Sequence, residues 1–363
     1  MSPERDRLQQ RVRNGEVIAD QSFGRLSLEH GDLSGAIFER TTFSGTRLAR
    51  AHLRECVFNA CRFTDVDLSN ADLSKSVFLN GELVRTDLSA SVLDNCRLAG
   101  TQASGTLFSR MRASRFTCLK SDLSACRFND AQIELGFFDE TPLAGADFTA
   151  ALIRKCFFYR LDMRAVRFAQ TVFERVVFTE SNLAGQHFSG QTFRGCQFID
   201  TDLRGADFTS ARLGQCNFQG ASLEQALMNE VDAACANFYR AKVERAQCRG
   251  AQFENSIWAE ARLRAADFTG ANLRGAVFHR ADASDCRFAQ AHLEGADFSY
   301  AELSGGNFDQ ATLGRTQFHR AGHAGWRGRP GAIDNDPARF AAEEWSKRRD
   351  GGWPPCPSIR EPL

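Results

Sequence analysis

The sequence predicts a solenoid, a single elongated stack of short coils, and three observations carry that prediction. From Phe23 to Phe318, every fifth residue is Phe, Leu, Ile, Val, Met or Trp in 54 of 60 positions. The residue two places earlier is Ala, Ser, Thr, Gly, Cys or Val in 53 of the same 60 units, and the register never slips. A period of five fits neither a helix nor an extended strand, but it fits a chain that turns a corner every five residues.

Positions within each unit are numbered here from the large apolar residue, called the core residue. The core residue and the small residue at position −2 are expected to point inward, whereas positions −1, +1 and +2 face water. Ala206-Asp207-Phe208 is a representative unit. One unit cannot bury its own apolar face, but stacked coils can.

Sixty units in phase, over about 300 of 363 residues, resemble the pentapeptide-repeat family. The resemblance implies an all-β fold, a right-handed quadrilateral β-helix with four units per coil and short helical caps. Sixty units then make about 15 coils, and a spacing of about 4.8 Å between coils gives a rod about 70 Å long. The four faces are named here by their first core residues as the Phe23, Leu28, Leu33 and Phe38 faces.

The ends of the stack need covers, because open coil ends would pair with other chains. Residues 1–22 are expected to form the N-terminal cap. Its helix is predicted to start at Pro3, to carry Leu8 and Val12 on one face, and to stop at Gly15.

The β-helix is predicted over residues 23–320, and residues 321–363 are expected to form a C-terminal capping helix and a Pro-rich tail. The helix is predicted to start at Pro337, because proline is favoured at the first helical position. Phe340 and Trp345 would then cover the last coil.

Two stretches have undersized core residues and are expected to show bending or altered turns, because lost core volume must be refilled. The first contains Ala103, Ala113 and Cys118, with the large Phe116 at a −2 position nearby, and the second spans residues 228–248. A hinge at either stretch is a further interpretation.

Twelve cysteines raise the question of disulfides or a metal site. Ten of them occupy core or −2 positions, which favours small buried side chains over metal ligands. Cys196 and Cys216 would stack one coil apart, within reach of a disulfide. The N-terminal residues contain no secretory signal peptide, so we expect free thiols in the cytoplasm. His319 and His323 form a close pair without a third ligand, so no metal is expected.

Charge and motifs argue against several functions. Lys+Arg and Asp+Glu both number 45, which gives no support to nucleic-acid binding driven by positive charge. No run of about 18 apolar residues exists, so no membrane span is expected. The sequence matches no P-loop, G-x-G-x-x-G, G-x-S-x-G or H-E-x-x-H motif. We therefore expect no enzyme activity, no cofactor and no small-molecule substrate.

Opposite charges alternate along one column of −1 positions spaced 20 residues apart. They are Arg47 with Asp67, Arg127 with Asp147 and Arg167, and Asp267 with Arg287. We interpret them as surface ion-pair ladders rather than an anion site, each pair contributing about 0–1 kcal/mol.

Sorting the outward positions by face separates the Phe38 face from the others. Among the 30 residues at −1 and +1 of each face, large apolar residues number one on the Phe23 face, two on the Leu28 face, three on the Leu33 face and thirteen on the Phe38 face. We call these thirteen residues the apolar stripe. Eight lie at −1 and five at +1: Ile37, Val57, Val77, Phe137, Phe157, Val177, Ile257 and Val277, then Leu79, Leu119, Tyr159, Ile199 and Tyr239.

A stripe of several hundred Å² exceeds what a soluble monomer usually exposes, so it is the candidate interface. Two other interpretations remain open. Branched and aromatic residues suit strands in general, and a terminal segment could fold back over the stripe. The leading hypothesis is a non-enzymatic bacterial scaffold or adaptor that binds a protein partner or another copy of itself along the Phe38 face.

The segment from Leu8 to Glu16, with Arg11 and Arg13, also resembles pentapeptide-repeat proteins linked to type VI secretion, which suggests an accessory role there. The family resemblance implies two alternatives. One is a DNA mimic that binds DNA gyrase or another topoisomerase, although residues 23–320 carry 34 basic and 35 acidic residues and mimicry needs a strongly negative surface. The other is an effector delivered into another cell by a Sec-independent secretion system.

Overall fold

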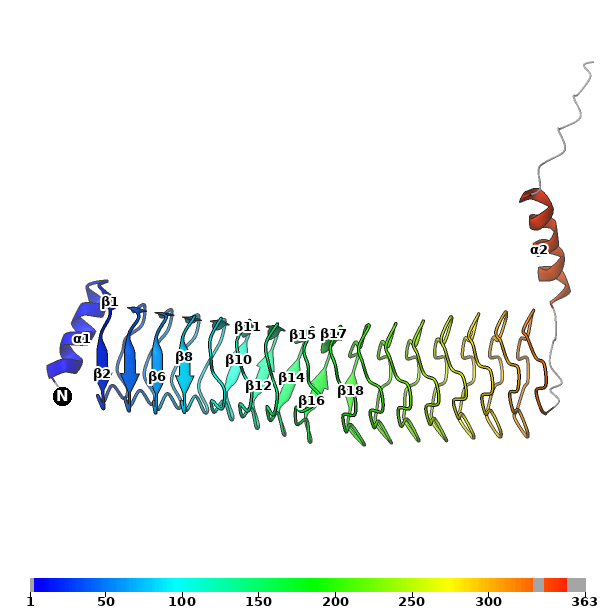
Figure 1. Cartoon of the computed structure of the whole chain (residues 1–363), viewed down its shortest axis with the longest axis horizontal. Helices are drawn as coiled ribbons and strands as arrows, with labels where there is room; N and C mark the ends of the chain where they lie inside the picture. Colours follow the sequence, from blue (N-terminus) through cyan, green and yellow to red (C-terminus); the bar gives the residue numbers. More distant parts are fainter. Residues whose placement is uncertain (1–2, 329–335, 351–363) are drawn as a thin grey trace, which may run out of the picture.

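The computed structural model describes residues 3–328 and 336–350 and shows a rod of stacked coils with one helix near each end (Figure 1). Helix α1, Pro3–Arg13, precedes the coils, and helix α2, Pro337–Asp350, follows them. The ladders pair residues 20 apart in parallel, so four five-residue units make one coil. The chain is a right-handed quadrilateral β-helix, as predicted.

Three-residue strands, and one of two residues, form three sheets. The Phe38 face carries β1 Val17–Ala19, β3 Ile37–Glu39, β5 Val57–Asn59, β7 Val77–Leu79, β9 Arg97–Ala99, β11 Thr117–Leu119, β13 Phe137–Asp139, β15 Phe157–Tyr159 and β17 Val177–Thr179. The Phe23 face carries β2 Ser22–Gly24, β4 Thr42–Ser44, β6 Arg62–Thr64 and β8 Glu82–Val84. The Leu33 face carries β10 Arg112–Ser114, β12 Gln132–Glu134, β14 Leu152–Arg154, β16 Val172–Glu174 and β18 Phe193–Arg194.

The longest sheet has nine strands, fewer than the 15 coils that were expected. Beyond β17 the same face continues as single bridges 20 residues apart, from Val177↔Gln197 to Asp297↔Gln317. The difference lies in the turns, because on this face the later coils have one bridged residue per unit where the earlier ones have three.

A left-handed residue at each corner lets the chain turn every five residues. Position +2 has a positive φ in every unit from Asp20 to Gly325 except at Ala165. Arg, Glu and Ala occupy many of these corners although the region favours Gly, Asn and Asp. The N–H of a corner residue donates to the +1 carbonyl of the next coil, as in Arg40 N to Asn59 O at 2.9 Å. Stacking therefore holds the left-handed conformation in place.

Small polar residues at −2 bind the backbone as well as filling space. The Thr41 hydroxyl donates to the carbonyl of Ile18 at 2.9 Å, and the Cys61 thiol donates to the carbonyl of Phe38 at 3.4 Å. In both cases the acceptor is the core residue 23 positions earlier, in the preceding coil. These bonds satisfy buried carbonyls that would otherwise be costly.

The first stretch of undersized core residues coincides with a change of turn. Between β8 and β10 the second row of strands moves from the Phe23 face to the Leu33 face, around Ala103 and Ala113. Phe116 is fully buried there, with its ring centre 6.3 Å from Phe108 and 6.1 Å from Phe138. Its large side chain refills the volume that the small core residues leave.

The second stretch, residues 228–248, keeps the regular bridges, so the expected change of turn is wrong there. Trp258 supplies the missing volume. Its ring stacks on Phe238 at 3.9 Å, and its indole N–H donates to the buried Ser256 hydroxyl at 2.7 Å.

The marked irregularity lies elsewhere, around Pro142. In the described residues, the bridges on the Phe23 face stop at Asp122 and resume at Asp162, because proline has no N–H to donate. A surface pocket opens where these coils separate, and the one corner without a positive φ, Ala165, lines it.

A second gap follows on the Leu28 face, where the bridges stop at Arg167 and resume at His187. Gln186 stands at a −2 position that is normally small. Its side-chain amide enters the gap and donates to the carbonyls of Met163 at 2.6 Å and Val166 at 2.8 Å. The bulky amide thus replaces the missing backbone bonds and keeps these coils apart.

The N-terminal helix forms as predicted, with Leu8 only 2% exposed and Val12 packed against the core. The coils begin earlier than expected, because Ile18 is already a buried core residue within residues 1–22.

The coils also extend past residue 320, to the bridge between Asn307 and Arg327. Trp326 lies over the end of the core, with ring centres 5.4 Å from Phe308 and 5.2 Å from Phe318. The prediction that Phe340 and Trp345 of α2 cover the last coil is wrong, because their side chains are 43% and 60% exposed. The Pro-rich tail lies outside the described residues.

Candidate functional site

The nine-stranded sheet and the single bridges that continue it place the apolar stripe on one face of the rod. Parallel register sets Phe137 beside Phe157 and Phe157 beside Val177, on β13, β15 and β17. The bridges beyond β17 carry the same column on to Ile257 and Val277. The stripe is therefore two parallel rows of side chains, one row of −1 positions and one of +1 positions.

The thirteen stripe residues differ in exposure. Four are among the exposed large apolar residues of the chain: Ile37 at 38%, Phe137 at 37%, Phe157 at 47% and Ile257 at 42%. The other nine are half-buried. Val17 on β1 belongs with them at 46% exposed, and we missed it because the repeat was counted from Phe23. The sequence indicated this extra unit through Ile18, an apolar residue five positions before Phe23 and in the same register. That these residues form an interface stays a prediction.

A rigid core supports the stripe from beneath. Phe138 and Phe158 are fully buried, and their rings stack at 4.8 Å. Each lies one residue from an exposed phenylalanine on the same strand, so side chains alternate between core and surface.

Two tyrosines of the stripe are held in place by salt-bridged arginines. The Arg160 guanidinium lies 4.5 Å from the ring centre of Tyr159 and pairs with Glu180 at 2.8 Å. The same arrangement recurs 80 residues later at Tyr239, where Arg240 lies 4.8 Å from the ring centre and pairs with Glu260 at 2.7 Å. Each ring is therefore packed against a guanidinium that is itself salt-bridged to the next coil.

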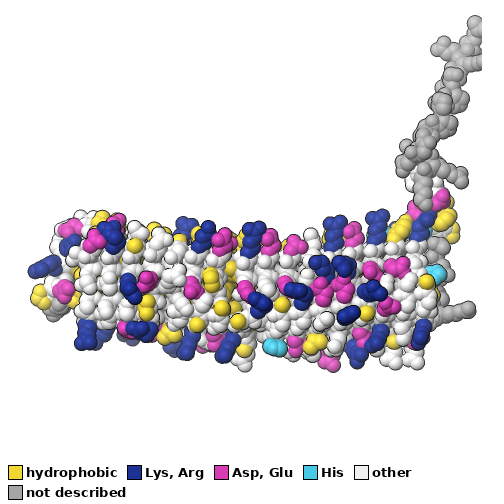
Figure 2. Space-filling view, viewed as in Figure 1, with side chains coloured by type: hydrophobic (Ala, Val, Ile, Leu, Met, Phe, Trp, Pro, Cys, Tyr) yellow, Lys and Arg dark blue, Asp and Glu magenta, His cyan; other side chains and the backbone are white. Residues whose placement is uncertain are grey.

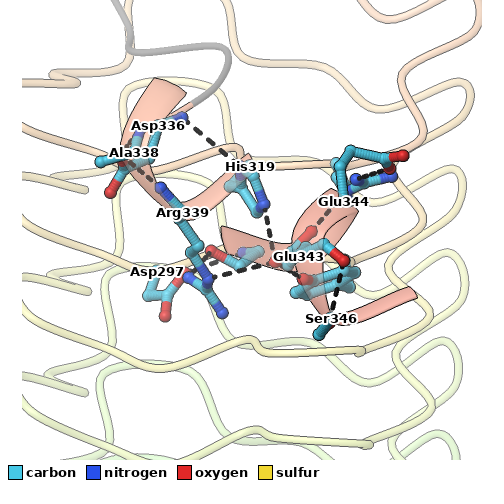
Figure 3. A network of polar contacts seen from close by, with 11 residues as sticks. Asp297, His319, Asp336, Ala338, Arg339, Glu343, Glu344 and Ser346 are labelled. Atoms are coloured by element: carbon cyan, nitrogen blue, oxygen red, sulfur yellow. Dashed lines mark hydrogen bonds and ion pairs between the residues drawn. The ribbon is translucent and has the colours of Figure 1, made fainter. Parts of the chain in front are cut away.

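Helix α2 docks on the Phe38 face just past the stripe (Figure 3). Arg339 donates to the Ser299 hydroxyl at 3.2 Å and lies over the Tyr300 ring at 5.4 Å. The Nε2 atom of buried His319 lies 3.0 Å from a carboxylate oxygen of Glu343. These contacts fall on the two coils after Val277, so α2 leaves the stripe uncovered.

Glu343 is the centre of this docking contact. It accepts hydrogen bonds from the Tyr300 hydroxyl and His319 and pairs with Arg320 at 2.6 Å, while Glu344 pairs with Arg320 at 3.1 Å. The Tyr300 bond first, then those of His319 and Arg320, lower the pKa of Glu343 from 4.5 to about 2.

Acid should release α2. The pKa of docked Glu343 lies below its ordinary value, so its contribution to docking is complete above about pH 4.5 and is lost as the pH falls towards 2. The anisotropy of a dye on Ala342→Cys, with Cys235 and Cys356 replaced by serine, should fall over this range. Glu343→Gln should show the low value already at pH 7, and Glu344→Gln should change it less. Anisotropy that stays constant from pH 7 to 2 would contradict this role of Glu343.

The cysteines take no part in a disulfide among the described residues, where all eleven are free. Burial raises the pKa of Cys196 to about 12 and that of Cys216 higher still. Cys235 is the exposed one, at a corner. Within the same residues no group of three or more His, Cys, Asp and Glu is arranged to hold a metal ion. His319 contacts Glu343 of α2, and His323 stacks on Trp326 with ring centres 5.1 Å apart.

Ion pairs between coils are common, and more of them join two corner residues than two residues of the predicted −1 column. Of the predicted pairs, Asp267 meets Arg287 at 3.6 Å, whereas Arg47 turns to Glu29 at 3.2 Å. Six pairs join corner residues 20 apart: Arg40 and Asp20, Lys75 and Glu55, Arg85 and Asp65, Lys120 and Glu140, Arg160 and Glu180, Arg240 and Glu260. Both signs therefore stand side by side on the surface (Figure 2).

Comparison with known proteins identifies the repeat. A family model described as "Pentapeptide repeat region" matches residues 32–108 and 171–248, and a model of eight pentapeptide repeats matches residues 246–282 and 276–315. The matched residues make up more than half of the chain. No curated protein matches. None of the helices in the described residues is long and apolar enough to cross a bilayer.

Several solved structures are similar to this chain at low identity and low TM-score. Trypsin-treated QnrB1, a plasmid-mediated fluoroquinolone resistance protein, is 20% identical over 50% of this chain and 88% of its own, with a TM-score of 0.34. HetL, a pentapeptide repeat protein involved in heterocyst differentiation regulation from the cyanobacterium Nostoc sp. strain PCC 7120, is 19% identical over 86% and 94%, with a TM-score of 0.14. Rfr23 from the cyanobacterium Cyanothece 51142 is 21% identical over 33% and 84%, with a TM-score of 0.18. These scores carry no argument about function.

Proposed function

Because the chain belongs to the pentapeptide-repeat family, we propose that it is a non-enzymatic scaffold or adaptor that binds protein along its Phe38 face. The observation that carries the proposal is the apolar stripe, which one flat sheet presents while the other faces are polar. Apolar residues scattered over a protein surface are normal, but their concentration on one face is typical of a protein interface, here in two rows that polar residues such as Arg97 and Asn217 interrupt.

The shape of the site favours a protein partner over a small ligand. Small-molecule sites are concave and enclose most of their ligand. The stripe instead lies on a flat sheet whose interior is filled, with Phe138 and Phe158 fully buried beneath it. A flat apolar row flanked by charged corners suits the extended surface of another protein.

Finer aspects of this proposal come from the sequence. We propose a cytoplasmic location, which the reduced, buried thiols support. An accessory role in type VI secretion and delivery as an effector both remain predictions, and the stripe is compatible with either.

The DNA-mimic alternative needs a surface of one sign. The paired corners, such as Arg85 with Asp65 at 2.5 Å, instead alternate in sign from coil to coil. An alternating surface does not reproduce the negative potential of two phosphate rows, so we rank this function second. Inhibition of gyrase supercoiling by submicromolar protein would reverse the ranking.

Partner capture tests the proposal. The immobilised full chain should retain a specific protein from a lysate of its native host, and Phe137→Ser/Phe157→Ser/Tyr159→Ser should retain at least tenfold less. The matched control is Leu152→Ser/Val172→Ser on the Leu33 face, where Val172 is as exposed as Phe157, at 47%. Equal capture by all three proteins, or neither partner nor oligomer under varied conditions, would refute the proposal.

A further inference from the structure

The stripe has an internal symmetry centred on β15. The row of +1 positions contains five apolar residues on alternate coils, and Tyr159 is the middle one. Its neighbours at equal distances are Leu119 with Ile199 and Leu79 with Tyr239. Reversing the direction of the rod about Tyr159 therefore places every apolar residue of this row on an apolar position of the same row, with Tyr159 on itself.

The row of −1 positions has the same centre. Phe157 is in the middle, with Phe137 and Val177 one coil away on either side. The outer residues match as well, Val57 with Ile257 five coils from the centre, and Ile37 with Val277 six coils from it. Of the thirteen, only Val77 maps onto a polar residue, Asn237, while Val17, outside the thirteen, maps onto Asp297. The two rows therefore have the same centre of symmetry. The same reversal matches twelve of the thirteen stripe residues with an apolar residue, and Phe157 and Tyr159 each map onto themselves.

This symmetry is what a twofold interface between identical chains requires, because residue i must contact j while j contacts i. We infer that the protein that binds the Phe38 face is a second copy of this chain, packed face to face and antiparallel, with the twofold axis along β15. The inference rests on the proposed function and names its partner.

Charge supports the antiparallel arrangement. Among the −1 and +1 residues that it brings together, Glu39 faces His279 and Arg97 faces Asn217, so no like charges meet. A parallel pair would instead set each −1 residue against the +1 residue of the same coil. Phe137 would then face Asp139 and bury a carboxylate against an aromatic ring, which is costly.

The size of the face agrees with a weak but specific dimer. Thirteen coils about 4.8 Å apart and strands about 10 Å wide give about 600 Å² per copy. The total of about 1,200 Å² lies at the lower limit of stable interfaces. Dimerisation should therefore depend on protein concentration in the micromolar range.

Helix α2 marks the end of the interface. It contacts Ser299 and His319, on the two coils after Val277, the last stripe residue. Among the described residues, the part of this face that α2 leaves free therefore ends where the symmetric part ends.

Site-specific crosslinking of the full chain tests the arrangement, in a background with Cys235→Ser and Cys356→Ser. A short bismaleimide should crosslink Tyr159→Cys to itself, because that residue lies on the axis and facing sheets are about 10 Å apart. Glu39→Cys alone and His279→Cys alone should give at least tenfold less dimer, because their copies lie about 58 Å apart across the axis. A mixture of these two variants should crosslink as well as Tyr159→Cys.

Three results would overturn the inference. Self-crosslinking of Glu39→Cys as strong as that of Tyr159→Cys would show a parallel pair. If the protein stays monomeric at 100 μM and a different protein binds through the stripe, the inference of a second copy is refuted and the proposed function is retained. A dimer unaffected by Phe137→Ser/Phe157→Ser/Tyr159→Ser would remove both.

Discussion

Replacing Phe158 with alanine is expected to lower the free energy of unfolding by roughly 3–5 kcal/mol, because it opens a cavity in a filled core. The side chain is fully buried, and its ring stacks between Phe138 at 4.8 Å and Phe178 at 5.4 Å. Thermal and denaturant melts of the purified variant would measure the loss. Phe138→Ala should behave alike, because it removes the other half of the same stack.

The adjacent residue provides the control. Phe157 is 47% exposed, and Phe157→Ala leaves the core column intact, so its free energy of unfolding should change by no more than about 0.5 kcal/mol in the monomer. A Phe157 variant that melts like a Phe158 variant would mean that the exposed row is covered, and the assignment of faces would be wrong.

Association should be lost when the centre of the stripe becomes polar. Phe137→Ser/Phe157→Ser/Tyr159→Ser removes three large apolar side chains from two adjacent coils. In the twofold dimer both copies lose these side chains, so at about 1 kcal/mol or more for each of the six the loss is roughly 6 kcal/mol, or more than about 10,000-fold in Kd. Light scattering over a concentration series would report the change in mass.

The same variant should keep its fold. All three residues lie outside the core positions, so its melting transition as a monomer should stay close to that of the parent chain. Association equal to that of the parent would mean that the apolar excess on this face reflects strand preference and no partner. Leu152→Ser/Val172→Ser, which alters the Leu33 face, should associate as the parent does.

The period of five was sufficient to predict a stack of coils and the direction of each side chain, and the family resemblance supplied the four-sided β-helix. Phe157 and Phe158 differ by one position and are 47% and 0% exposed, as the numbering required. The prediction succeeds because every unit meets the same surroundings in the coils before and after it. A local pattern therefore determines the global structure, as in other repeat proteins.

The sequence also contained signals that we did not use. Leu161, Gln186 and Gln191 are three of the seven large residues at −2 positions, and Pro142 lies close before them. Together they mark the coils where the ladders are interrupted. We looked for irregularity in small core residues, but Phe116 and Trp258 restore that volume and leave the coils stacked.

By itself the sequence determined the repeated unit and the direction of its side chains and, with the four units per coil that the family resemblance implies, the four faces and the stripe. The tertiary structure decided the rest. It placed α2 on the side of the rod through Glu343 and Arg320, and it left Trp326 to cover the last core ring. These contacts join residues whose spacing follows no repeat, so the balance of hydrogen bonds and burial in the folded chain settles them, and no periodic pattern could have predicted them.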